Sequence, residues 1–211
     1  MHIQEFRGFA NGILVFSIFT VFNLSIRELE LLKAVSSAAA VTTIILISVT
    51  LLLGPLSRFF PTHFRHDLVY RKPLGLAGFF FALVHAVSAF YGSYNANLGF
   101  IFSSANPNFW PAIFAIISLL ILGVLAITST PQAIKQLTFP KWKQLQRLGY
   151  VALFFAVLHF VFVDNFQFLQ TITGKAVLAL AMIAMFAKLV AMALDIDKAH
   201  SKKEIEHLTK E

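Results

Sequence analysis

Six long apolar segments, separated by short polar stretches, dominate the pattern of this chain. They lie at about 9–26, 34–57, 73–94, 109–130, 148–166 and 171–192. Because ~20 apolar residues in a helix cross the ~30 Å hydrocarbon core of a bilayer, each segment is long enough to span a membrane. Only Asp164, Lys175 and Lys188 bring charge into these segments, each near an end. The pattern predicts an all-α integral membrane protein, a six-transmembrane-helix bundle over residues 1–194, followed by a tail over 195–211.

The positive charges lie mainly on one side of this predicted bundle. Thirteen Lys and Arg residues fall on the side of the two chain ends, and two, Arg27 and Lys33, on the opposite side. The segment 95–108 carries no charge. Because cytoplasmic loops are enriched in Lys and Arg, we expect both termini to be cytoplasmic, with 195–211 as a short solvated helix. We expect the first segment to stay attached as an uncleaved anchor, since it is long for the apolar region of a signal peptide.

Composition supports the membrane prediction and excludes several classes of function. Hydrophobic residues make up 58% of the 211 and charged residues 13%, against ~25% charged in typical soluble domains, so a soluble single domain is excluded. The chain has a net charge of +7, but its Lys and Arg residues lie between apolar segments and not on one polar surface. This distribution argues against nucleic-acid binding. The chain has no Cys, which excludes disulfides, Cys-ligated metals and thiol catalysis. The basic loops 58–72 and 131–147 suit anionic lipid headgroups or, alternatively, an anionic cofactor. No internal repeat is visible.

Two of the seven histidines, His85 and His159, lie deep in the apolar segments. They stand 12 and 11 residues past the inner ends of the third and fifth segments, or roughly 18 and 16–17 Å at the helical rise. Both segments run from inside to outside, so the two imidazoles are expected at one depth. Ionisable groups at such depth are candidates for function.

Small residues precede each of these histidines on the same helical face. They are Gly78 and Ala82 before His85, and Ala152 and Ala156 before His159, at distances of seven and three residues. Two facing strips of small residues would leave a flat slot, which suits a porphyrin with one imidazole on each side of its iron. The alternative is a small transporter or scaffold without heme, in which the histidines bond between closely packed helices. A bare metal site lacks a third ligand at this depth, and a proton-coupled transporter would need further buried carboxylates.

Several short motifs, taken in order, resemble a known family. They are Gly54-Pro55-Leu56-Ser57-Arg58, Arg71-Lys72-Pro73-Leu74-Gly75, Leu83-Val84-His85, Thr128-Ser129-Thr130, Lys141-Trp142-Lys143-Gln144-Leu145, Tyr150 and Leu158-His159-Phe160. Their order and spacing resemble the ferric-reductase-like transmembrane domain superfamily, and within it the YedZ/MsrQ family. Members of that family are heme-binding membrane subunits that serve a periplasmic methionine sulfoxide reductase.

The resemblance implies a b-type heme held by His85 and His159 in the bacterial inner membrane, passing electrons to an outer-side acceptor. It implies a separate donor, either quinol or a flavoprotein, and an acceptor such as a periplasmic reductase. A flavin is possible but has no support in the residues, and we expect no nicotinamide or flavin domain in the chain. In the family, the fifth helix usually carries a further histidine about 13 residues before the deep one, suited to an inner heme. This chain has Gln146 at that position, 13 residues before His159. Glutamine is a poor iron ligand, so we expect one heme unless His63 or His66 substitutes.

Overall fold

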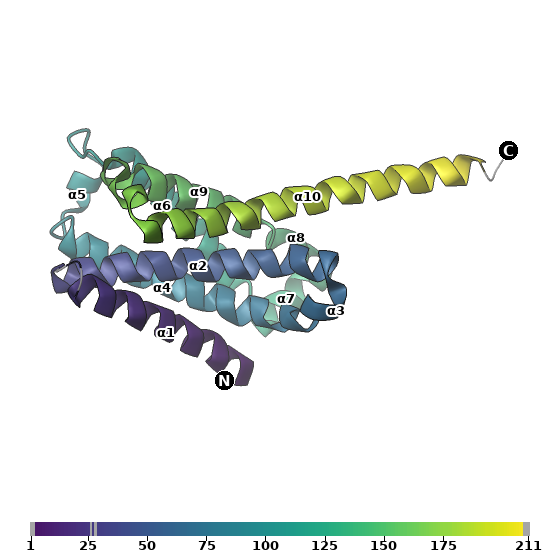
Figure 1. Ribbon diagram of the computed structural model, residues 1–211, viewed down its shortest axis with the longest axis horizontal. Coiled ribbons are helices and arrows are strands. Elements are labelled where there is room, and N and C mark those ends of the chain that lie inside the picture. The colour runs from purple at the N-terminus through teal and green to yellow at the C-terminus, as the bar shows by residue number, and fades with distance from the viewer. Residues whose placement is uncertain (1–2, 26, 28, 209–211) are drawn as a thin grey trace.

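The computed structural model describes residues 3–25, 27 and 29–208, and within these residues every regular element is helical (Figure 1). The long helices are α1 (Ile3–Ser25), α2 (Leu31–Phe59), α4 (Arg71–Gly92), α6 (Phe109–Ile127), α9 (Leu148–Phe162) and α10 (Ile172–Leu208). The short ones are α3 (Pro61–Phe64), η1 (His66–Tyr70), α5 (Leu98–Ile101), α7 (Pro131–Leu137), α8 (Phe139–Leu145) and η2 (Val163–Gln170).

The long helices have the length and apolarity of membrane spans. In the described part of the chain, five qualify by length and composition, at Leu31–Phe59, His66–Gly92, Phe109–Ile127, Phe139–Phe162 and Ile172–Leu194. The apolar part of α1, Phe9–Ser25, is shorter; at ~1.5 Å per residue it reaches roughly 25 Å, near the lower limit for a span. Many large apolar side chains point outward, including Leu120, which is 65% exposed. This outward apolar surface suits lipid, and the prediction of an all-α integral membrane bundle is confirmed.

The basic loops gather at one end of the bundle. Figure 1 shows α3, α7 and α8 at the same end, with α5 at the opposite end. The elements α3 and η1 belong to the loop 58–72, and α7 and α8 to the loop 131–147, whereas α5 belongs to the uncharged segment 95–108. The positive charge is therefore one-sided in space, as the charge pattern predicts.

Several helix boundaries differ from the expected segments, among them the ends of α9 and α10. The fifth segment was expected to run to residue 166, but α9 ends at Phe162, because Val163 has extended backbone angles of φ −64° and ψ 141°. The next residues, Asp164 and Asn165, have low helix propensity, and the chain continues as the 3-10 helix η2. The tail beyond residue 194 is helical as far as Leu208 and continuous with α10, which extends past the other helices (Figure 1). Residues 209–211 lie outside the described part.

Helices α2 and α4 form an antiparallel hairpin with polar contacts at intervals of seven residues. In the first contact, Ser36 Oγ lies 3.1 Å from His85 Nδ1. In the second, the Thr43 hydroxyl donates to the Gly78 carbonyl at 3.4 Å, and in the third, Arg71 Nε donates to the Thr50 carbonyl at 3.1 Å. Seven residues are about two helical turns, so all these contacts fall on one face of each helix. The series fixes the register of α4 against α2.

A second hairpin, α6 with α9 and the residues just before it, has polar contacts of the same kind. Its contacts run from His159 Nδ1 to the Pro111 carbonyl at 2.9 Å, from the Ser118 hydroxyl to the Ala152 carbonyl at 2.9 Å, and from Gln146 Nε2 to the Leu125 carbonyl at 3.4 Å. The likeness of the two hairpins is invisible in the sequence because most acceptors are backbone carbonyls, which every residue has. The two hairpins thus present one deep histidine each.

A proline in α2 explains one bond between the hairpins. Pro55 lies inside α2 and has no N–H, so the Leu51 carbonyl lacks its usual helical donor. The Tyr150 hydroxyl of α9 donates to that carbonyl at 2.8 Å. This bond ties α9 to α2 at the point where the helix lacks one of its own bonds.

Tyr150→Phe is therefore expected to lower the free energy of unfolding in mixed micelles by about 1 kcal/mol, since it leaves a carbonyl unsatisfied inside the bundle. In a Pro55→Ala background the restored N–H takes the Leu51 carbonyl, so the same change costs less than about half as much. Denaturant titration of the four proteins measures the difference. An equal cost in both backgrounds would contradict this role for Tyr150.

Candidate functional site

The two deep histidines meet between the hairpins. The ring centres of His85 on α4 and His159 on α9 lie 5.8 Å apart, with 59° between the ring planes. The common depth expected from the sequence therefore brings the two side chains together. The sequence could not show that the two helices present them to each other, but the structure does.

Each imidazole is held by a backbone carbonyl of the preceding long helix. His85 Nδ1 lies 3.0 Å from the Ser36 carbonyl oxygen, and His159 Nδ1 lies 2.9 Å from the Pro111 carbonyl oxygen. A carbonyl can only accept a hydrogen bond, so Nδ1 of each ring carries the proton. In the neutral ring Nε2 then keeps its lone pair, which is the usual arrangement of a metal-binding histidine.

The ring separation is close to that of two imidazoles on opposite sides of one metal atom. A metal–imidazole bond is ~2.0–2.1 Å long and the ring centre lies about 1.2 Å beyond the nitrogen, so two such rings have centres about 6.4 Å apart. The observed separation is 5.8 Å, so the two rings would move apart by about half an ångström to hold one metal atom. Among the described residues, no group of three or more His, Cys, Asp or Glu could hold a metal ion. A heme iron needs only axial ligands from the protein, because the porphyrin supplies the other four.

Of the four small residues near the histidines, two are tightly packed against neighbouring helices and two are half-buried. A Cβ at Gly78 would lie 2.7 Å from Ile47 Cδ1, so the glycine allows α2 and α4 to approach closely. Ala152 is fully buried in the core. Ala82 and Ala156 are half-buried. Gly78 therefore has a packing role within its own hairpin, and the lining of a flat pocket by all four residues stays a prediction.

The inner end of the bundle holds no histidine pair in the described residues. Gln146, the residue at the expected inner heme level, donates through Nε2 to the Leu125 carbonyl at 3.4 Å and to Ser129 Oγ at 3.3 Å. The loop histidines His63 and His66 are exposed, and His63 Nδ1 lies 3.0 Å from Thr62 Oγ1.

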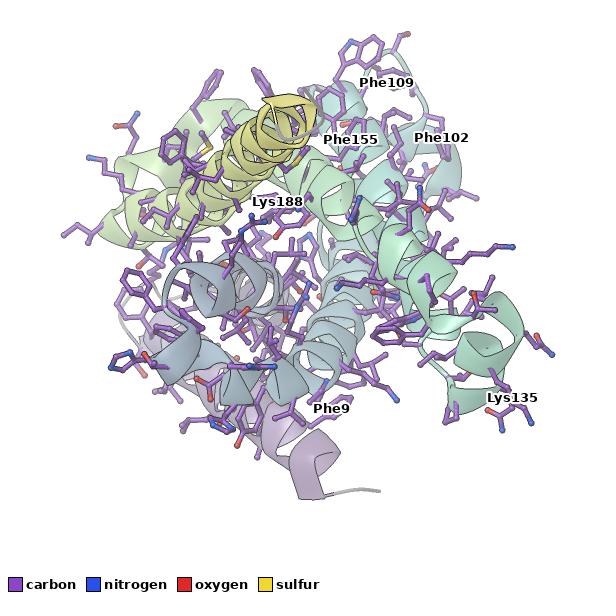
Figure 2. All side chains as sticks on the ribbon, turned by 90° about the vertical axis from the view of Figure 1, so that its right-hand side faces the viewer. Phe9, Phe102, Phe109, Lys135, Phe155 and Lys188 are labelled. Atoms are coloured by element: carbon purple, nitrogen blue, oxygen red, sulfur yellow. The ribbon has the colours of Figure 1, made fainter. Side chains whose placement is uncertain are left out.

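One charged side chain of the spans, that of Lys188, contacts a residue other than the two histidines. Lys188 of α10 faces the other helices in Figure 2, with Nζ 5.8 Å from the centre of the Tyr150 ring. The side chain of Asp164 is outside the described part of the structure, as are those of His2, His200 and His207.

Sequence reasoning missed the two residues that hold the imidazoles, Ser36 and Pro111. A signal for Ser36 exists: the hydroxyl residues Ser36, Thr43 and Thr50 recur every seven positions on one helix. On the next helix Arg71, Gly78 and His85 recur with the same spacing. Pro111 has no comparable signal, because it acts through its backbone carbonyl.

Comparison with known proteins gives two matches. The family model described as ferric reductase like transmembrane component matches residues 39–157, more than half of the chain. The matched region includes His85 and ends two residues before His159. The magnetosome protein MamZ of Magnetospirillum gryphiswaldense is 32% identical over 98 residues, which are 46% of this chain and 15% of that protein. The match to MamZ thus spans a small part of that relative. The extent of the family match shows that this chain belongs to the ferric reductase-like transmembrane components.

Proposed function

We propose that this protein is a membrane electron-transfer subunit that binds one b-type heme through His85 and His159. The observation that supports it most is the facing pair of imidazoles, 5.8 Å apart, each with Nδ1 bonded to a carbonyl. Membership of the ferric reductase-like family supports a membrane electron-transfer subunit of the oxidoreductase type. Assignment to the YedZ/MsrQ family in particular is part of the proposal and rests on the resemblance of its motifs.

In this proposal the heme supplies reversible one-electron chemistry, and the protein holds and orients it. His85 and His159 would hold the iron through Nε2, and the carbonyls of Ser36 and Pro111 would fix the orientation of their rings. In this proposal the half-buried Ala82 and Ala156 line the pocket, while Gly78 and Ala152 let the helices behind it pack closely. The surrounding apolar helices exclude water, which influences the potential of the iron.

In this proposal the one-sided charge sets the orientation of the protein in the membrane. We infer that the end with α3, α7 and α8 is cytoplasmic, as are both termini, in a bacterial inner membrane. His85 is 14 residues from the start of α4 and seven from its end, so the site lies nearer the opposite, outer face. Quinol or a flavoprotein would supply electrons, and an outer-side acceptor, such as a periplasmic reductase, would take them.

Vesicles test electron transfer across the membrane. The purified protein is reconstituted into liposomes that contain trapped ferricyanide, and dithionite is added outside. We expect the trapped ferricyanide to be reduced several times faster than in protein-free vesicles or in vesicles with the His159→Ala variant. A heme-loaded protein whose vesicles are no faster than protein-free ones would contradict the electron-transfer function while leaving heme binding intact.

A further inference from the structure

The side chain of Ser36 adds a second contact to one of the two imidazoles. Ser36 is buried, and its Oγ lies 3.1 Å from His85 Nδ1, beside its own carbonyl oxygen at 3.0 Å. Since the carbonyl can only accept, Nδ1–H is the donor in this group of three atoms. The hydroxyl oxygen therefore also accepts, and the Nδ1–H of His85 is shared between two oxygens of one residue.

The second hairpin lacks this feature at the matching position. His159 Nδ1 bonds to the carbonyl of Pro111, whose side chain has no polar atom. Each imidazole thus donates to one backbone carbonyl, but only His85 has a side-chain hydroxyl beside that carbonyl. The position of that hydroxyl is fixed by the α2–α4 register, because Ser36 belongs to the seven-residue series that continues in Thr43 and Thr50.

An extra acceptor on Nδ1–H changes the imidazole as a ligand. Withdrawing the proton toward oxygen raises the basicity of the ring, so Nε2 donates more electron density to a metal. A more basic axial ligand stabilises the oxidised iron over the reduced iron. We propose that Ser36 is a positioning residue that lowers the reduction potential of the iron held by His85 and His159. This inference rests on the proposed function and adds to it a residue that adjusts the potential.

The test is a redox titration of the purified protein, followed by the visible heme spectrum. In Ser36→Ala the carbonyl contact remains and only the hydroxyl is lost, so we expect a full low-spin heme content with a more positive midpoint potential. The expected change is about threefold in the equilibrium constant for reduction, or about 28 mV at 59 mV per tenfold for one electron. Ser36→Thr keeps the hydroxyl and is expected to titrate with the wild type.

Ser37→Ala is the matched control, because Ser37 is the neighbouring half-buried serine of the same helix. We expect it to leave the midpoint potential unchanged. A heme-loaded Ser36→Ala protein with the wild-type potential would overturn the role of Ser36 and leave the proposed function standing. An equal shift in Ser37→Ala or Ser36→Thr would also overturn it, since the cause would then be a general change in α2. A wild-type protein without heme would instead overturn the proposed function.

Discussion

Replacing either His85 or His159 with alanine is expected to abolish the low-spin heme spectrum. The two ring centres lie 5.8 Å apart, and each Nε2 keeps a lone pair because its Nδ1 donates to a carbonyl. Removing one imidazole would take away one of the two ligands that the proposed site offers, and a low-spin b-type spectrum needs both. A reduced-minus-oxidised visible spectrum of each purified variant measures the loss.

Histidines outside the pair supply the controls for this experiment. His63 and His66 are exposed loop residues, and alanine at either position is expected to leave the spectrum unchanged. The tail variants His200→Ala and His207→Ala should behave likewise, since both residues follow the last predicted segment. Full retention of the low-spin spectrum in His85→Ala or in His159→Ala would show that the pair does not ligate heme.

Each chain is expected to bind one heme rather than two. An inner heme would need a ligand at the position of Gln146, whose amide is already bonded to the Leu125 carbonyl of α6 and to Ser129 just beyond it. An amide is a poor ligand for heme iron. Pyridine-hemochrome quantification against protein concentration should give a ratio near one.

Variants at the inner end distinguish the possible origins of a second heme. Gln146→Ala removes hydrogen bonds but no iron ligand, so the ratio is expected to stay near one. A ratio near two in the wild type, falling to about one in His63→Ala or His66→Ala, would contradict the single-heme prediction. It would show that a loop histidine has taken the place of the missing ligand.

The spans and the depth of the histidines follow from the sequence because both depend on local properties. An apolar segment of sufficient length predicts a membrane helix, and the constant rise of the helix converts a residue count into a depth. His85 and His159 could therefore be placed at one level before the structure was known. The end of α9 at Phe162 was not predicted, because the apolar residues Val163 and Phe166 stand on both sides of Asp164 and Asn165, two residues with low helix propensity.

The partners of the imidazoles depend on tertiary contacts that side-chain types reveal only in part. Gly78 was expected beside a pocket, but helical periodicity gives a face and not the identity of the neighbour on that face. The structure places Ile47 of α2 against it. The carbonyl of Pro111 could not be identified from residue type at all. Ser36 could have been identified from the sequence, because hydroxyl residues recur every seven positions at Ser36, Thr43 and Thr50.

The central claim is that His85 and His159 together hold one heme, and the purified wild-type protein tests it most directly. The measurement is its reduced-minus-oxidised visible spectrum after production in cells supplied with a heme precursor. The account predicts the sharp α and β bands of a low-spin b-type heme. A folded, colourless protein that takes up no added hemin would contradict it and would favour a helix-packed membrane protein in which the two histidines serve another purpose.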